Sequence, residues 1–271
     1  MSSKTFYRQA VLILTLALAC VPGVVAEARP IPHGTVELIA ENTSIQPGHS
    51  FYAGLNFHLD AGWHIYWINP GDAGEPPRVT WHLPPGFAAQ PIEWPLPKAL
   101  PASSDMDFGY ENQVLLLVPL TAGPSKISAD IAADIKLIVC REVCIPGKAQ
   151  VGLSLPVANG AAPPNPQTRE LFEAARKQLP RPAPPSWRFT ATSGKDSFQL
   201  AAVVGHPVQK AFLFPLEASQ IENAAAQPVQ PTRTGFTMTL KKSDQLLKPI
   251  GQLKGVLLVG ARGYTVTAPV K

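Results

Sequence analysis

The sequence has 271 residues, of which 45% are hydrophobic and 30 are proline, and its formal net charge is +4. The length suits one large domain or two small ones, and the hydrophobic content is enough for a buried core. So small a charge, with no basic stripe, excludes a nucleic-acid-binding surface, and prolines spread between hydrophobic segments favour a β-rich chain over disorder.

Residues 1–26 have the three parts of a secretory signal peptide. Lys4 and Arg8 give a basic start, residues 10–19 form an apolar run, and small residues lead to a cleavage site after Ala26. Cleavage removes two positive charges and no acid, so the formal charge falls from +4 to +2. We therefore expect an exported, periplasmic protein.

Two alternatives concern this leader. The apolar run is short for an uncleaved anchor, because a membrane-spanning helix needs about 20 apolar residues. A lipid on Cys20 is the other alternative, but Ala17 stands three positions before it, where a lipid-attachment signal has leucine. Both alternatives are weaker than cleavage after Ala26.

Residues 27–156 carry short segments in which polar and apolar residues alternate, separated by turns rich in proline and glycine. Alternation with period two is typical of half-buried antiparallel strands. The expected strands are residues 34–41, 50–60, 63–67, 79–83, 113–120, 127–139 and 149–155. About seven short strands at this spacing predict an immunoglobulin-like β-sandwich.

Residues 157–186 are predicted to form a proline-rich linker with one helix. Asn165 and Pro166 have the residue types of a helix start, with asparagine as the N-cap and proline at the first helical position. The apolar face of the helix consists of Leu171, Phe172, Ala175 and Leu179. Prolines from Pro180 onward end it, and we expect it to pack against one domain or between two.

Residues 187–271 return to short strands and contain no cysteine. The expected strands are residues 187–192, 198–204, 211–214, 235–240, 255–259 and 264–267. The predicted fold class is therefore all-β, with an immunoglobulin-like sandwich over residues 27–156, the helix-containing linker, and a second, smaller β-sandwich domain.

Only Cys140 and Cys144 remain once the leader is removed. In an extended strand their Cα atoms would lie about 13 Å apart, at roughly 3.3 Å per residue. A disulfide tolerates about 4.4–6.8 Å. A bond between them therefore requires a helical turn or a tight bend, and we expect the pair at the tip where one strand ends and the next begins.

The pair has a structural and a redox interpretation. Two cysteines in an exported β-domain are more often a staple. A three-residue gap, however, closes a very short loop and stabilises little by constraining the unfolded chain. Positive charge from Lys136, Arg141 and Lys148 favours a thiolate, although Glu142 offsets part of it.

A metal site is a further alternative. Two thiolates suit a soft ion such as Cu(I), whereas a closed zinc site needs four ligands. His58, His64 and His82 are the candidate additional ligands, but each falls in a strand pattern. A packed or exposed strand histidine is the more common case, so a copper-handling protein would depend on the two sulfurs alone.

Longer motifs in the first domain are distinctive. They are LDAGWHIYWINPGDAG at 59–74, PPGF at 84–87, PIEWP at 91–95, FGYE at 108–111 and VCREVCIPG at 139–147. Together they resemble the periplasmic amino-terminal domain of the DsbD/ScsB class of thiol–disulfide reductases, strongly over residues 34–156 and less specifically beyond. The gap between the cysteines is similar to that of the ScsB-like branch.

The resemblance implies an immunoglobulin-like domain in which Cys140 and Cys144 are the catalytic redox pair, with no cofactor and no metal. It also implies an aromatic cap loop, to which Asp107–Glu111 corresponds, so Phe108 and Tyr110 are the expected cap residues. An apolar lid would keep the wrong oxidant away from a dithiol. Ordinary core packing of the two aromatic rings is the alternative.

The expected partners are periplasmic thioredoxin-like or disulfide-isomerase-like proteins. The sequence to Lys271 has no membrane-spanning bundle and no thioredoxin-like CxxC domain, so we expect a separate membrane electron donor of DsbD/ScsB type to reduce the pair. The predicted activity is thiol–disulfide exchange. The alternatives are a non-catalytic binding module with a structural disulfide and a copper-handling protein.

Overall fold

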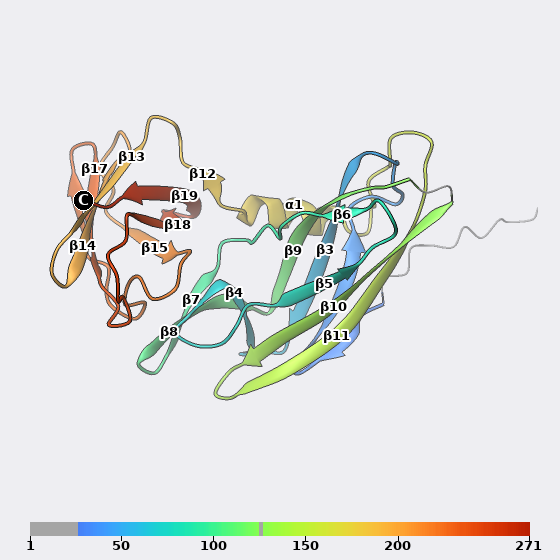
Figure 1. Cartoon of the computed structure of the whole chain (residues 1–271), viewed down its shortest axis with the longest axis horizontal. Helices are drawn as coiled ribbons and strands as arrows, with labels where there is room; N and C mark the ends of the chain where they lie inside the picture. Colours follow the sequence, from blue (N-terminus) through green and yellow to red (C-terminus); the bar gives the residue numbers. More distant parts are fainter. Residues whose placement is uncertain (1–26, 125–126) are drawn as a thin grey trace, which may run out of the picture.

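The computed structural model describes residues 27–124 and 127–271, so the predicted signal peptide and Cys20 lie outside the described residues. Strands dominate, and this part of the chain contains a single helix, α1 (Arg169–Gln178). The predicted all-β class is confirmed. Figure 1 shows the strands in two groups, with α1 on the path between them. No helix in the described ranges is long and apolar enough to cross a membrane.

The first group of strands is a sandwich of two sheets, which we call the first sandwich. One sheet has the order β1-β2-β3-β9-β6. Its strands are β1 (Arg29–Ile31), β2 (Gly34–Ala40), β3 (Ser50–Leu59), β6 (Ala88–Ala89) and β9 (Gln113–Thr121). The facing sheet has the order β11-β10-β4-β8-β7, and β5 also pairs with β10. Its strands are β4 (His64–Gly71), β5 (Arg78–His82), β7 (Lys98–Ala102), β8 (Asp105–Glu111), β10 (Ser128–Cys140) and β11 (Cys144–Pro156).

Side-chain alternation decides which residues fill the space between these sheets. In β10, the odd-numbered residues from Ala129 to Val139 belong to the core, and the even-numbered residues face outward. In β4, Ile65 and Trp67 belong to the same core. Successive side chains of a strand point to opposite faces, so Cys140 lies on the outer face of the sheet.

Every predicted strand of residues 27–156 overlaps an observed strand, but the short strands β1 and β6 and one hairpin were not predicted. Strands β7 and β8 pair antiparallel, so Asp107–Glu111 is strand and not loop. Prolines such as Pro95 and Pro101 interrupt the alternation here and hide the strands. Pro101 is tolerated because β7 is an edge strand.

The second group of strands forms the second sandwich, of two four-stranded sheets in the orders β12-β19-β18-β15 and β13-β14-β17-β16. The strands are β12 (Arg181–Pro182), β13 (Arg188–Ser193), β14 (Ser197–Val203), β15 (Ala211–Pro215), β16 (Val229–Thr232), β17 (Gly235–Lys241), β18 (Gln252–Val259) and β19 (Arg262–Pro269). Large buried side chains of its core include Phe198, Phe236 and Met238. Only its short strands β12 and β16 were not predicted.

The helix begins later than predicted. The side-chain oxygen of Asn165 accepts a hydrogen bond from the backbone N–H of Gln167 at 3.0 Å. The carbonyl oxygen of Asn165 accepts one from the N–H of Arg169, also at 3.0 Å. These bonds form a turn ahead of the helix, whose N-cap is Thr168.

The helix packs on the outer face of the first sandwich. Phe172 and Ala175 are buried there against Ile39, Leu115 and Leu117. The guanidinium of Arg176 forms a bidentate ion pair with Glu41. The buried apolar side of the helix and the bidentate ion pair beside it hold the helix on the first sandwich. They therefore fix the path of the chain toward the second sandwich.

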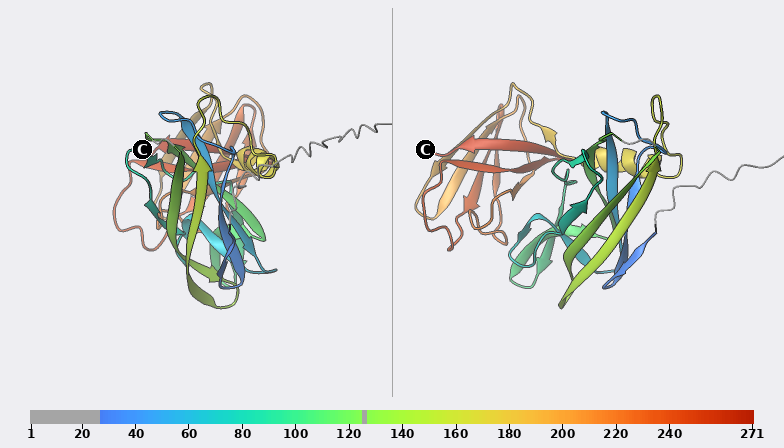
Figure 2. Two further views of the ribbon diagram at one scale, coloured as in Figure 1. Left: turned by 90° about the vertical axis from the view of Figure 1, so that its right-hand side faces the viewer. Right: turned by 45° about the vertical axis from the view of Figure 1, so that its right-hand side comes forward.

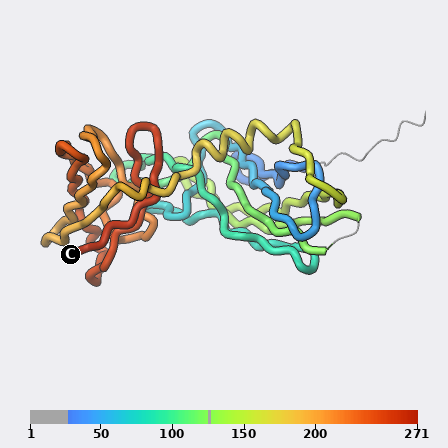
Figure 3. The backbone as a smooth tube through the Cα atoms, turned by 90° about the horizontal axis from the view of Figure 1, so that it is seen from above, coloured from blue at the N-terminus to red at the C-terminus, as the bar shows by residue number. Residues whose placement is uncertain are grey.

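The two sandwiches share an aromatic interface. Phe214 and Val256, from the second sandwich, belong to the core of the first. The ring of Phe214 lies 5.3 Å from that of Phe108 and 6.1 Å from that of Trp67, in both cases edge to face. Figures 2 and 3 show the two sandwiches side by side, joined through the segment that carries α1.

Candidate functional site

The cysteine pair closes the tip of a long hairpin. Strands β10 and β11 pair antiparallel from Ser128 opposite Pro156 up to Cys140 opposite Cys144. The two sulfurs form a disulfide, and the Cα atoms lie 4.2 Å apart. The expected position at a strand end is confirmed, with a tight hairpin bend in place of a helical turn.

The two cysteines differ in exposure. Cys140 is 1% exposed, because it ends β10 beside His64 of β4. Cys144 begins β11, at the edge of the sheet, and is exposed. An approaching thiol or disulfide therefore reaches the sulfur of Cys144 first.

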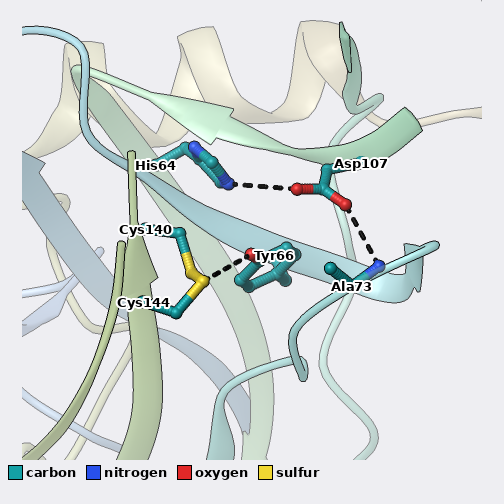
Figure 4. The surroundings of a disulfide bond; sticks show 6 residues. All are labelled: His64, Tyr66, Ala73, Asp107, Cys140 and Cys144. Atoms are coloured by element: carbon teal, nitrogen blue, oxygen red, sulfur yellow. Dashed lines mark hydrogen bonds and ion pairs between the residues drawn. A yellow bond between two sulfur atoms is a disulfide. The ribbon is translucent and has the colours of Figure 1, made fainter. Parts of the chain in front are cut away.

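A buried tyrosine lies against the exposed sulfur. The hydroxyl oxygen of Tyr66, on β4, is 3.7 Å from Sγ of Cys144 (Figure 4). A disulfide sulfur carries no hydrogen, so the phenol is the donor. The side chain of Tyr66 is fully buried, and the Asp107 carboxylate is the other neighbour of its hydroxyl.

An acidic side chain of β8 completes this outer face. A carboxylate oxygen of Asp107 lies 3.7 Å from Nε2 of His64, and the other accepts a hydrogen bond from the N–H of Ala73 at 3.1 Å. Burial, and then the charge and hydrogen bonding of Asp107, raise the pKa of Tyr66 above its ordinary value. Tyr66 therefore stays neutral and keeps its proton at neutral pH.

The loop between β4 and β5 covers the tyrosine ring. Gly74 has φ +75°, and a Cβ atom there would lie 2.1 Å from Cζ of Tyr66. The backbone can approach the ring this closely only because the residue is glycine. We call residues 72–77 the covering loop.

The two expected cap residues lie elsewhere. Phe108 and Tyr110 are on β8, where Tyr110 lies opposite Ile65 of β4 and Phe108 opposite Ala99 of β7, and both belong to the core of the first sandwich. The Tyr110 hydroxyl donates to the carbonyl of Pro95 at 2.7 Å. Both side chains thus point to the face opposite Cys140, and the structure places the covering loop and Tyr66 beside the disulfide instead.

The positive charge at the tip comes from one residue. The guanidinium of Arg141 lies 5.3 Å from the ring centre of Trp63, which stacks on His33 with 3.6 Å between the centroids. Lys136 and Lys148 face each other four positions down the hairpin, about 13 Å from its tip at roughly 3.3 Å per residue. The expectation that three basic residues crowd the pair is wrong for these two lysines.

The three strand histidines do not gather at the sulfurs. His64 alone lies at the site, while His58 contacts Asn56 and His82 pairs with Asp134. Among residues 27–124 and 127–271, no group of three or more histidine, cysteine, aspartate or glutamate side chains could hold a metal ion.

Neither Tyr66 nor Asp107 was among the expected site residues, although Asp107 begins the segment expected to form the cap loop. Asp107 is 4% exposed in the structure, but it lies in β8, a strand that the sequence pattern did not reveal. Buried acids need partners, so they often mark a site. Tyr66 stands in an aromatic run that is buried on both faces, so its environment could not be read from the pattern.

The buried tyrosines predict a loss of stability at alkaline pH. Burial raises the pKa of Tyr110 well above its ordinary value, and Tyr66 is raised as well. In the unfolded chain both tyrosines ionise near pH 10, whereas in the folded protein they stay protonated to higher pH. The folded state therefore has its full stability below pH 10 and loses stability as the pH rises toward the folded pKa values. The free energy of unfolding should therefore fall by up to about 1.4 kcal/mol per pH unit for each tyrosine. Urea unfolding between pH 8 and pH 11 measures this, and a Tyr66→Phe Tyr110→Phe variant should lose most of the slope.

Comparisons with known proteins concern the first sandwich and the fold of the chain. Residues 35–156 match the family model described as thiol:disulfide interchange protein DsbD, N-terminal. The structure of the N-terminal periplasmic domain of ScsB from Proteus mirabilis superposes with a TM-score of 0.69 at 17% identity, covering 90% of this chain and 96% of that one. At that identity the similarity concerns the fold.

Two other results add no argument. A protein of unknown function from Porphyromonas gingivalis W83 aligns with 12% identity over 86% of this chain and 99% of its own, but at a TM-score of only 0.23. No curated protein sequence matches. Residues 35–156 thus match the DsbD amino-terminal family, and the chain shares the fold of the ScsB amino-terminal periplasmic domain.

Proposed function

We propose that this chain is a periplasmic thiol–disulfide interchange protein that passes reducing equivalents to partner proteins through Cys140 and Cys144. The observation that carries the proposal is the asymmetry of the pair. Cys144 is exposed at the hairpin tip with a phenol beside its sulfur, and Cys140 is buried directly across from it. A partner protein therefore contacts the sulfur of Cys144, while the sulfur of Cys140 stays within bonding distance of it.

The proposed reaction has two exchange steps. In the reduced protein, the Cys144 thiolate attacks one sulfur of a partner disulfide, and the other partner sulfur leaves as a thiolate. The Cys140 thiolate then attacks Sγ of Cys144 and releases the first partner sulfur as a thiolate. The partner gains two electrons, the Cys140–Cys144 pair loses two, and a membrane donor reverses the exchange.

The neighbouring side chains support the thiolate at Cys144. The Tyr66 hydroxyl donates a hydrogen bond to the sulfur, and hydrogen bonds to charged groups are the stronger ones. Asp107 disfavours ionisation of the phenol, so Tyr66 keeps its proton. Such exchange requires no cofactor.

The proposed partners follow from the family. A thioredoxin-like or disulfide-isomerase-like protein would receive the electrons, and a separate membrane protein of the DsbD/ScsB type would supply them. The periplasmic location is proposed from the family match and from the compartment that the name of the similar ScsB structure states.

A redox titration tests the proposal against a structural staple. We expect the Cys140–Cys144 pair to equilibrate with dithiothreitol or glutathione at a reduction potential above about −300 mV, the range of exchange proteins. The fraction of reduced protein can be measured by alkylation and mass spectrometry. A potential below about −300 mV, or a disulfide that does not exchange in the folded protein, would contradict the proposed function.

A further inference from the structure

We infer that the second sandwich positions the Tyr66 phenol against Cys144, acting through Asn223 and the covering loop. The inference rests on the proposed exchange function and deepens it, because it assigns residues 187–271 a role in thiolate stabilisation. It depends on a continuous set of contacts from Asn223 to the exposed sulfur, and each contact can be tested separately.

The first contact crosses between the sandwiches. Asn223 lies in the segment between β15 and β16 and is 4% exposed. Its side-chain N–H donates to one carboxylate oxygen of Asp72, the first residue of the covering loop, at 2.7 Å. The amide is buried while Asp72 is exposed, and a hydrogen bond from an amide to a carboxylate is directional.

Asp72 fixes the start of the covering loop on the β7–β8 hairpin. Its second carboxylate oxygen accepts from the N–H of Met106 at 2.8 Å, and its own N–H donates to the Met106 carbonyl at 3.1 Å. One side chain therefore joins the second sandwich, the covering loop and the hairpin that carries Asp107.

The next two residues of the loop reach the site. The N–H of Ala73 donates to Asp107, and the backbone of Gly74 lies against the ring of Tyr66. Little space remains for the ring to tilt away from the sulfur while the loop stays in place. The position of the hydroxyl, 3.7 Å from Sγ of Cys144, is thus set by the loop above the ring.

A second tie anchors the same loop. The side-chain N–H of Asn69, on β4, donates to the carbonyl of Pro215 in the second sandwich at 2.8 Å. Its side-chain oxygen accepts from the N–H of Gly71 at 3.2 Å. The residues immediately before the covering loop are therefore also held by the second sandwich, and Asn69 is 2% exposed.

Cys144 stays exposed in this arrangement, so the second sandwich does not close the site. Its effect is on the charge state of the sulfur. When the loop loosens, Tyr66 is free to move, and the thiolate loses its donor.

The test uses the Cys140→Ser background, in which Cys144 is the only thiol once the leader is absent. The rate of alkylation by iodoacetamide, followed from pH 5 to pH 10, gives the thiolate fraction of Cys144. Three further substitutions are compared in that background. Tyr66→Phe removes the donor, Asn223→Ala removes the tie, and Asp72→Asn weakens it.

Gln220→Ala is the matched control. Gln220 is also a buried amide, 4% exposed, and it donates to Glu217 of the same sandwich at 2.8 Å. It makes no contact with the covering loop among the described hydrogen bonds. Any general loosening of the second sandwich should therefore affect Gln220→Ala and Asn223→Ala alike, as melting temperatures will show.

We expect Tyr66→Phe to lower the thiolate fraction of Cys144 about tenfold when the pH is below the pKa of Cys144. Loss of a hydrogen bond to a charged sulfur has an effect of this size. Asn223→Ala and Asp72→Asn should lower it about threefold, and Gln220→Ala should leave it unchanged. In the presence of Tyr66→Phe, Asn223→Ala should have no further effect, because both act through one hydrogen bond.

The outcomes separate this inference from the proposed function. If Asn223→Ala and Asp72→Asn keep the wild-type thiolate fraction, or if Asn223→Ala acts equally with and without Tyr66, the second sandwich does not position the phenol. Normal exchange by the wild-type pair in that case leaves the proposed function standing. A wild-type pair inert to glutathione would instead remove the function and this inference with it.

Discussion

Replacing Cys140 with serine should convert the protein into a trap for mixed disulfides, whereas replacing Cys144 should not. In Cys140→Ser the exposed Cys144 sulfur still attacks a disulfide, but no second sulfur is available to release the product. In Cys144→Ser the remaining sulfur, on Cys140, is 1% exposed and can react only when the hairpin tip opens.

The measurement is mass spectrometry of each reduced variant after incubation with oxidised glutathione. We expect Cys140→Ser to form the glutathione adduct at least about tenfold faster than Cys144→Ser, because reactivity follows access to the thiolate. Melting temperatures of the two variants control for damage to the fold. Equal rates, or faster capture by Cys144→Ser, would overturn the assignment of Cys144 as the attacking sulfur.

Phe108→Ala should destabilise the protein by about 3–5 kcal/mol and should leave the chemistry of the disulfide unchanged once the protein is folded. The ring of Phe108 is fully buried and packs against both Phe212 and Phe214 of the second sandwich. Its removal leaves a cavity where the two sandwiches meet. Urea unfolding measures the loss of stability. Phe236→Ala is the control, because its ring is similarly buried but lies in the core of the second sandwich alone.

The conservative variant Phe108→Leu separates packing from shielding. It keeps most of the buried volume, so we expect the folded protein to react with glutathione at a rate within about twofold of the wild type, since the side chain faces away from Cys140. A rate several-fold higher, without a matching loss of stability, would show that Phe108 does shield the pair.

Much of the fold was predictable because alternation is a local property. Strand β10 has one face in the core and one outside, and its sequence records this residue by residue. The β7–β8 hairpin was missed because its prolines break the pattern and because its pairing depends on β4, about 40 residues away in the sequence. Long-range pairing of that kind leaves no local signal.

The site was only half predictable for the same reason. Cys140 and Cys144 stand close together in the sequence, and spacing alone required a bend between them. Tyr66 and Asp107 come from two other strands, and they approach the sulfur only through the register of β4 with β10 and β8. The resemblance to a family suggested a cap near Phe108, but strand alternation turned that ring to the opposite face.

The aromatic contact between the sandwiches bears on how a partner is met. Phe214 and Val256 complete the core of the first sandwich, so the two halves of the chain cannot hinge apart without exposing apolar rings to water. The aromatic contact therefore opposes bending between the two halves when another molecule docks. The protein then loses little conformational freedom on binding. This favours brief, repeated binding of partners over binding that requires a slow conformational change.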